Sequence, residues 1–300
     1  MRVGVDCALC LFHRGYMEIL EATDDPNLRF KAIIQLLDML AKNFNPEAIP
    51  AVLGTMRDRI IKQTTRNPDP YAEKKRAGNI EAMRLLPLAE KAISEQPDPE
   101  LRFRKACLIA IVGNIMEFNI PGHTFNLKDF GRLLYEAEDD LAVDDISEAF
   151  KIAGKANLIV YLADNAGEIA FDILLVKELK NLCKRVVVAV KGEPVYNDAT
   201  MEDALFVGID KVADSVITTG TDMMGLLISE CSMDFLKVYD SADFVVAKGM
   251  GNAETITEMD LNVPHLLLLR TKCANVANYF RVERNKNIAK ILYPGKRIMP

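Results

Sequence analysis

The stretch that decides the fold is Leu158-Ile159-Val160-Tyr161-Leu162-Ala163-Asp164-Asn165-Ala166-Gly167-Glu168, in which an apolar run ends abruptly in polar residues and glycine. Such a run, followed by a helical pattern from Ile169, predicts a buried strand, a tight loop and a helix. Strands of a parallel sheet are covered on both faces, so their polar residues collect at the ends. In open α/β sheets, binding sites are usually built at these ends.

The same change of pattern recurs along the chain after residue 155. β-rich runs alternate with helical runs, which predicts an α/β fold with a doubly wound, mostly parallel sheet. We expect strands at 158–163, 186–190, 215–219, 244–247 and 266–269. We expect helices near 169–181, 200–207, 223–238, 253–260 and 273–281. The tail around Ile288 and Ile291 fits either a final helix or an edge strand.

Residues 1–150 show a helical pattern of about six helices and no convincing strand. We expect helices to begin where an acid or amide precedes proline, at Asp25-Pro26, Asn45-Pro46, Asp69-Pro70 and Asp98-Pro99. One helix should bury an apolar face that repeats every three or four residues, formed by Phe30, Ile33, Ile34, Leu37, Leu40 and Phe44. We therefore expect a helical domain at 1–150 that packs over the site, and an α/β catalytic domain at 151–300.

The composition excludes several classes of protein. The formal net charge of −6, from 37 basic and 43 acidic residues, argues against a protein that binds nucleic acid through phosphate contacts. No apolar run approaches the roughly 20 residues that a membrane span requires. The N-terminal residues lack a signal-peptide core, so we expect a cytoplasmic protein that does not associate with membranes.

The cysteines and histidines form few motifs. Cys7 and Cys10 are the one Cys-x-x-Cys pair in the sequence, whereas a structural zinc site requires four ligands, usually from two pairs. We favour the interpretation that Cys7 and Cys10 are simply two thiols near the start of a helix. A redox or metal role that borrows a distant ligand stays open. His265 lies in an apolar run, which favours a place in the core over metal ligation.

Each predicted strand is followed by a polar or glycine-rich loop, and parallel strands bring these loops to one edge of the sheet. Asp164, Asn165 and Asp198 offer the oxygen ligands that Mg²⁺ or Mn²⁺ prefers. Lys248 and Lys272 could balance phosphate charge, and glycines let backbone N–H groups approach an anion. Taken alone, each loop is better explained as an ordinary turn, because turns are rich in the same residues. The prediction of a site depends on five loops of matching character at one edge of the sheet.

The sequence lacks both the dinucleotide-binding motif and the P-loop motif. Gly249-Met250-Gly251 begins like the dinucleotide-binding motif, but Glu254 occupies the position of the third glycine. The sequence contains no Gly-x-x-x-x-Gly-Lys-Ser/Thr, so a P-loop kinase is disfavoured.

The combination of loops resembles the damage-control metal-phosphatase family, also described as domain of unknown function 89. The similarity in the second half lies in Asp164-Asn165-Ala166-Gly167-Glu168, Asn197-Asp198 after the Lys191-Gly192 loop, Lys248-Gly249-Met250-Gly251-Asn252-Ala253-Glu254 and Arg270-Thr271-Lys272-Cys273. The helical half matches the prokaryotic branch at Asp69-Pro70-Tyr71-Ala72-Glu73-Lys74-Lys75, Asn79, Gly113-Asn114 and Cys7-x-x-Cys10. The resemblance therefore covers nearly the whole chain.

This resemblance implies an all-helical N-terminal region packed against a Rossmann-like α/β domain. It also implies a divalent-metal-dependent phosphatase that hydrolyses small phosphomonoesters, such as sugar phosphates or damaged phosphometabolites. It implies that Asp164, Asn165 and Asp198 bind the metal ion, which would be Mg, Mn, Co or Ni. It places Lys248 on the substrate phosphate. Further substrate-binding residues would be Gly249, Asn252 and Lys272, together with Glu73, Asn79 and Asn114 from the helical half.

The mechanism expected from these residues is an in-line attack on phosphorus. Asp164 is a candidate ligand or nucleophile, with metal-bound water as the other candidate nucleophile. Glu254 and Asp222 are candidate acid–base groups. Two alternatives remain, namely an S-adenosylmethionine-dependent carboxyl methyltransferase and a non-catalytic protein that binds a phosphometabolite. The sequence does not indicate an oligomeric state.

Overall fold

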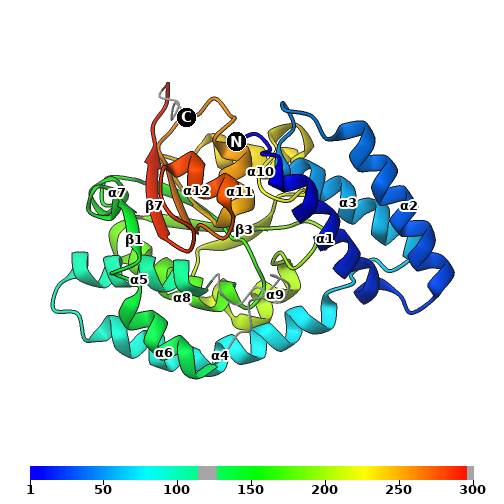
Figure 1. Ribbon diagram of the computed structural model, residues 1–300. Helices are drawn as coiled ribbons and strands as arrows, with labels where there is room; N and C mark the ends of the chain where they lie inside the picture. Colours follow the sequence, from blue (N-terminus) through cyan, green and yellow to red (C-terminus); the bar gives the residue numbers. More distant parts are fainter. Residues whose placement is uncertain (114–126, 296–300) are drawn as a thin grey trace.

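The computed structural model describes residues 1–113 and 127–295, and a twisted sheet runs through the middle of the molecule (Figure 1). The strands are β1 (Leu141–Asp144), β2 (Leu158–Leu162), β3 (Arg185–Val190), β4 (Ser215–Thr218), β5 (Phe244–Lys248), β6 (His265–Arg270) and β7 (Asn287–Leu292). Their order across the sheet is β1-β7-β6-β5-β2-β3-β4. Strands β2 to β6 are parallel, β7 is antiparallel to β6, and β1 is parallel to β7.

The helices precede the sheet in the first half of the chain and alternate with its strands in the second. The first six are α1 (Asp6–Ala22), α2 (Pro26–Asn43), α3 (Pro50–Thr65), α4 (Ala72–Ser94), α5 (Pro99–Gly113) and α6 (Leu127–Glu136). The others are α7 (Ile146–Ala153), α8 (Glu168–Leu182), α9 (Met201–Val207), α10 (Met233–Asp240), α11 (Gly249–Ile256) and α12 (Ala274–Phe280). The predicted α/β class with a doubly wound, mostly parallel sheet is confirmed.

The strand order creates a switch point between β2 and β5. The chain runs from β2 outward through β3 to β4, and then returns to the other side of β2 to form β5 and β6. The loop after β2 and the start of α11 after β5 therefore leave the sheet side by side, and α8 and α11 then pack on opposite faces. Crevices of this kind are where open α/β sheets bind ligands.

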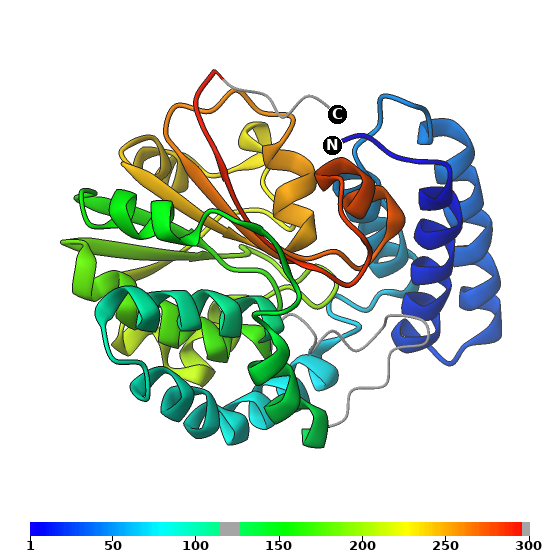
Figure 2. The same ribbon diagram turned by 60° about the vertical axis from the view of Figure 1, so that its left-hand side comes forward.

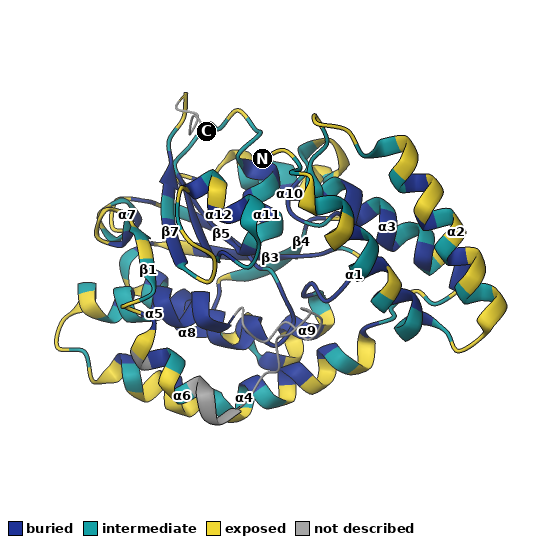
Figure 3. Cartoon of the chain, in the orientation of Figure 1, coloured by how far each residue is buried: buried dark blue, intermediate teal, exposed yellow. Residues whose placement is uncertain are grey.

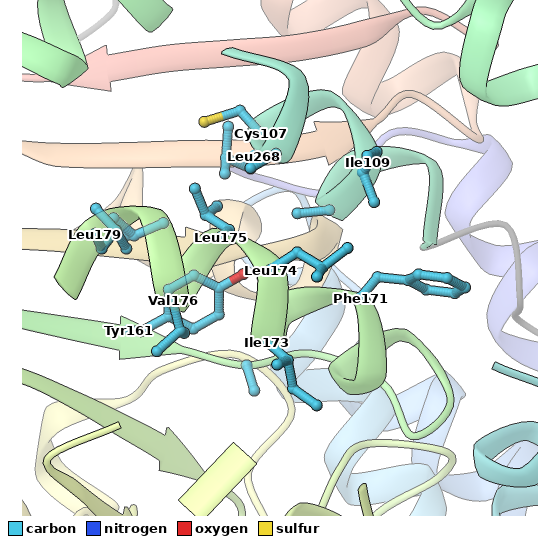
Figure 4. Close-up of a cluster of buried hydrophobic side chains, with 14 of the residues drawn as sticks. Cys107, Ile109, Tyr161, Phe171, Ile173, Leu174, Leu175, Val176, Leu179 and Leu268 are labelled. Carbon is cyan, nitrogen blue, oxygen red and sulfur yellow. The ribbon is translucent and has the colours of Figure 1, made fainter. Parts of the chain in front are cut away.

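Both faces of the sheet are covered, which explains the apolar strands (Figure 2). Ile159 and Tyr161 of β2 point into the core formed with α4, α5, α7 and α8, whereas Val160 and Leu162 point into the core with α10, α11 and α12. Figure 4 shows the first core, with side chains of α8 gathered beside Cys107 of α5 and Leu268 of β6. The helix α8 is hydrophobic almost all round because it lies between α5 and the sheet.

Helices α1, α2 and α3 form a separate group beside the sheet and have a small core of their own (Figure 1). This core contains Leu36 of α2, while Phe30, Ile34 and Leu37 are exposed at 70%, 54% and 51%. The predicted apolar face of this helix is therefore only partly correct. The helix packs through Ala32, Leu36 and Met39, so half of the expected face points outward (Figure 3).

Two of the four expected helix starts are correct. Asp25 and Asp98 precede α2 and α5, and each side chain accepts backbone N–H bonds of the first turn. By contrast, α3 begins at Pro50 and α4 at Ala72, each a few residues after the predicted proline. The Asn45 and Asp69 side chains bond N–H groups two residues later, which forms turns rather than helix caps.

The first half of the chain also contributes a strand that its sequence did not indicate. β1 has only four residues, too few for a clear alternating pattern, and it pairs with β7. The tail forms β7, which lies between β6 and β1 rather than at the edge. The division of the chain at residue 150 stays a prediction, and α5, from before that point, packs in the same core as α8. Within the described residues, no helix has the length and apolar character needed to cross a membrane.

The α2 packing can be tested by two neighbouring leucines. We expect Leu36→Ala to lower the free energy of unfolding by about 2–5 kcal/mol, because it leaves a cavity in a closed core. We expect Leu37→Ala to change it by less than about 0.5 kcal/mol, since that side chain is half exposed. Urea denaturation measures both. Equal losses would contradict the orientation of α2.

The burial of His265 should make the free energy of unfolding depend on pH. Burial lowers the pKa of this histidine from 6.5 to about 4, and its ring nitrogens contact the Tyr239 hydroxyl and the Val263 carbonyl. The folded state keeps the ring neutral while the unfolded state protonates it, so stability falls as the pH drops from 6.5 to 4. The full loss is about 3 kcal/mol. Urea titrations across this range should show a shallower slope for His265→Gln than for the unchanged protein.

Candidate functional site

A cavity of about 600 Å³ lies where α1 and α3 face the carboxyl ends of the strands. One wall comes from α1 and α3, and the other from the loops after β2, β3, β4 and β6 and from α11, which follows β5 directly. Because it includes the loops on both sides of the switch point, the cleft lies at the place that the topology favours for a site.

The structure brings the three predicted metal ligands together on this wall. Asp164, Asn165 and Asp198 all line the cleft. Asn165 and Asp198 form an antiparallel bridge, and the Ala199 N–H donates to the Asp164 carbonyl at 2.8 Å. The loops after β2 and β3 are thus hydrogen-bonded to each other. The Asn165 amide also donates to Asp164 Oδ2 at 2.8 Å, which leaves the Asn165 Oδ1 as its acceptor atom.

Gly249 makes room for the Asp164 carboxylate. Its φ is +79°, in the region that favours glycine, and a Cβ placed there would lie 1.8 Å from Asp164 Oδ2. Any side chain at this position would displace the carboxylate. The role predicted for Gly249 was binding of substrate, whereas its contact in the structure is with Asp164.

A buried ionic network lies beneath these residues. The Lys248 ammonium donates to Asp172 Oδ1 at 2.9 Å and also to Glu168 Oε1, and all three side chains are fully buried. Glu168 Oε2 accepts from the Asn165 amide at 3.0 Å, while Asp172 Oδ1 accepts from the Tyr161 hydroxyl at 2.7 Å. Lys248 is therefore not among the residues that line the cleft. The resemblance had placed this lysine on the substrate phosphate.

The network keeps its lysine charged. Burial by itself would lower the pKa of Lys248, but Asp172 and Glu168 outweigh burial and raise it. Burial also raises the pKa of Asp172 to about 6, against the opposing effect of Lys248. Charge of both signs is thus held in the core, where each partner depends on the other.

The other predicted site residues fall into three groups. Glu254 and Lys272 line the cleft. Asn79 and Asn252 are buried and support loops: Asn79 Oδ1 accepts from the Gly167 N–H at 2.6 Å, and the Asn252 amide donates to the Lys248 carbonyl at 2.8 Å. Glu73 is exposed in the first turn of α4.

Two further candidates do not join these groups. Asn114 lies outside the described residues. Asp222 binds Arg59 at 2.6 Å and Lys62 at 3.2 Å, away from the cleft lining. The Arg59 and Lys62 cations hold the pKa of Asp222 below its usual value although burial acts to raise it. An ion-paired carboxylate of this kind suits a structural contact better than proton transfer.

Sequence reasoning missed the helical wall of the cleft. Arg57 and Arg14 place their guanidinium groups 5.3 and 5.6 Å from the centre of the Tyr196 ring. Arg57 is buried and bonded to Glu18 at 3.0 Å, and the Tyr196 N–H donates to Asp58 at 2.8 Å. Tyr196 has a φ of +47°, uncommon for a residue with a side chain. The contacts of Tyr196 with Arg14, Arg57 and Asp58 join residues more than a hundred positions apart, so no local pattern could reveal them.

The thiols of Cys7, Cys10 and Cys273 also line the cleft. Burial raises the pKa of Cys7 to about 11, which opposes formation of a reactive thiolate. Among the described residues, no group of three or more His, Cys, Asp or Glu side chains has the arrangement of a metal site. The favoured interpretation of the cysteine pair is consistent with these observations.

The buried network predicts a large loss of stability when its cation is removed. We expect Lys248→Met to lower the free energy of unfolding by about 3–5 kcal/mol, because two carboxylates then stay buried without their partner. Lys42→Met is the matched control, since Lys42 pairs with Asp38 at 2.7 Å on the surface and should cost under about 1 kcal/mol. Urea denaturation measures both variants. Similar small losses would contradict the network.

Comparisons with known proteins cover nearly the whole chain. The model of the damage-control phosphatase ARMT1-like domain matches residues 3–288. A damage-control phosphatase of Archaeoglobus fulgidus is 34% identical over 293 residues, covering 97% of this chain and 100% of that protein. An uncharacterised protein of Methanocaldococcus jannaschii is also 34% identical over 293 residues, covering 96% of this chain and 95% of that protein.

The fold leads to the same relatives. A damage-control phosphatase of Pyrococcus horikoshii is 30% identical over 285 residues, covering 95% of this chain and 96% of that protein. The crystal structure of a DUF89 family protein from Pyrococcus horikoshii superimposes with a TM-score of 0.87 at 30% identity, covering 99% of this chain and 100% of that one. The chain therefore belongs to the damage-control phosphatase ARMT1-like family, as its loops had suggested.

Proposed function

We propose that this protein hydrolyses small phosphomonoesters with the help of a divalent cation. The observation that carries the proposal is the convergence of Asp164, Asn165 and Asp198 on one wall of the cleft at the switch point. Relatives at 30–34% identity are named damage-control phosphatases, which supports the reaction class. Sugar phosphates and damaged phosphometabolites are the substrates that we propose, and the cytoplasm is the compartment.

The residues present fit a hard divalent cation. Two carboxylates and an amide oxygen are the ligand types that Mg²⁺ and Mn²⁺ prefer, and Co²⁺ and Ni²⁺ accept similar sets. The backbone of Gly249 leaves the space that the Asp164 carboxylate occupies. When bound, such a cation would neutralise charge on the phosphate and orient it for in-line attack.

The chain's own residues would divide the remaining work. Asp164, Asn165 and Asp198 would hold the cation, and Glu168 keeps the Asn165 amide turned so that Asn165 Oδ1 is its free acceptor. Lys272 supplies a cation to the cleft lining, and Glu254 supplies a carboxylate able to exchange a proton with the leaving alcohol or water. Lys248 is left out of this assignment because Glu168 and Asp172 enclose it.

The proposal predicts activity that depends on both metal and carboxylates. In a panel of sugar phosphates and cofactor fragments with Mg²⁺, Mn²⁺, Co²⁺ or Ni²⁺, we expect phosphate release that a chelator abolishes and added metal restores. Asp164→Ala and Asp198→Ala should each lower kcat/KM by at least about a hundredfold, near 3 kcal/mol of transition-state stabilisation. Asp234→Ala is the control, because its exposed carboxylate lies on α10 away from the cleft.

The same experiment separates the alternatives. Methyl transfer from S-adenosylmethionine to a carboxylate that persists after metal removal, with no phosphate release from the panel, would favour the methyltransferase. Tight binding of phosphorylated ligands without phosphate release from any of them would favour the binding protein. A phosphoryl group trapped on Asp164 would identify the aspartate, rather than water, as the nucleophile.

A further inference from the structure

Asn197 carries a buried oxygen atom that no donor in the described part of the chain reaches. The residue is 6% exposed and lines the cleft beside Asp198. Its Oδ1 has no hydrogen-bond partner within residues 1–113 and 127–295. An unpaired buried acceptor costs about 1–3 kcal/mol, and most buried polar groups have a partner for this reason. A ligand in the cleft is the natural partner for this atom.

The backbone around Asn197 is held from several sides. Its carbonyl accepts the Ala166 N–H at 2.9 Å, and the Asp198 N–H donates to the Val195 carbonyl at 3.0 Å. The N–H of the preceding Tyr196 donates to Asp58, and the Arg57 guanidinium lies against the Tyr196 ring. The unpaired amide oxygen is therefore presented on a constrained loop rather than left over in a loosely packed turn.

The neighbours of Asn197 decide which kind of ligand fits. Asp164, Asn165 and Asp198 line the same cleft, and the loops that carry them are bonded to the Asn197 loop. The Lys191 ammonium lies 3.5 Å from Asp198 Oδ2 and donates to the Gly225 carbonyl at 2.7 Å. A partly negative oxygen next to two carboxylates is repelled by them. A divalent cation is attracted to all of these oxygen atoms together, and carboxylate and amide oxygens are the ligands that it takes in proteins.

We propose that Asn197 Oδ1 is a fourth protein ligand of the divalent cation held by Asp164, Asn165 and Asp198. The inference rests on the proposed function, which assigns only the other three residues. Two carboxylates and two amides give the set a charge that matches the cation. Six-coordinate Mg²⁺ or Mn²⁺ would keep two positions for a phosphate oxygen and water.

The test uses the full chain and Mn²⁺ alone, without substrate. Isothermal titration calorimetry should give a Kd for Mn²⁺ at least tenfold weaker in Asn197→Ala than in the unchanged protein. The melting temperature without metal should stay the same or rise, because the substitution removes an unpaired buried acceptor. Asn197→Asp, which retains an oxygen at this position, should bind Mn²⁺ at least as tightly as the unchanged protein.

Asn287→Ala is the matched control. Asn287 is equally buried in β7, but it accepts from Arg270 at 2.7 Å and donates to the Ala137 carbonyl at 3.0 Å. Its replacement should lower the melting temperature and leave the Kd for Mn²⁺ unchanged. The Mn²⁺ titration is repeated with Asn197→Leu, whose side chain has a shape similar to that of asparagine. If the alanine variant does not fold, the leucine variant still gives the result.

The outcomes distinguish the inference from the function beneath it. If the folded Asn197 variants bind Mn²⁺ as the unchanged protein does, while Asp164→Ala does not, Asn197 is not a ligand and the proposed function stands. If the unchanged protein itself binds no Mn²⁺, Mg²⁺, Co²⁺ or Ni²⁺, the proposed function fails together with the inference. A weaker Kd in both the alanine and leucine variants, with the fold intact, supports the fourth ligand.

Discussion

The contact on which the site most depends is the buried ion pair of Lys248 with Glu168 and Asp172. It joins the end of β5 to the first turn of α8, on the two sides of the switch point. Burying three charges is costly, so the arrangement persists only while every partner stays in place. The cleft residue Asn165 is bonded to Glu168, so its orientation depends on this network.

The cleft also requires a part of the chain far from the sheet in sequence. Helices α1 and α3 close it, and their charged residues hold the loop that carries Asp198. Tyr196 keeps its uncommon backbone conformation because Asp58 bonds its N–H and two guanidinium groups lie against its ring. The helical group therefore does more than cover the site, since it positions one of the proposed metal ligands and its neighbour Asn197.

Local patterns predicted the parts of the molecule whose cause is local. An apolar run bounded by polar residues identified all five parallel strands from β2 to β6 to within about one residue, because strands covered on both faces have little choice of side chain. The short strand β1 was not predicted, since four residues are too few to show a clear alternation of apolar and polar side chains. The outward-facing side of α2 was misassigned because periodicity shows that a helix has an apolar stripe, but not what covers it.

The sequence by itself determined the fold class, the loops that meet at the strand ends and the family, since strand pattern and loop residues are local properties of the chain. Only the tertiary structure decided what each loop residue does. The fold places the Glu168 and Asp172 carboxylates against the Lys248 ammonium, and it buries the Asn197 side-chain oxygen where no donor of the described residues reaches it. Charge and hydrogen-bonding capacity belong to a residue, whereas the partners that satisfy them depend on how distant segments pack.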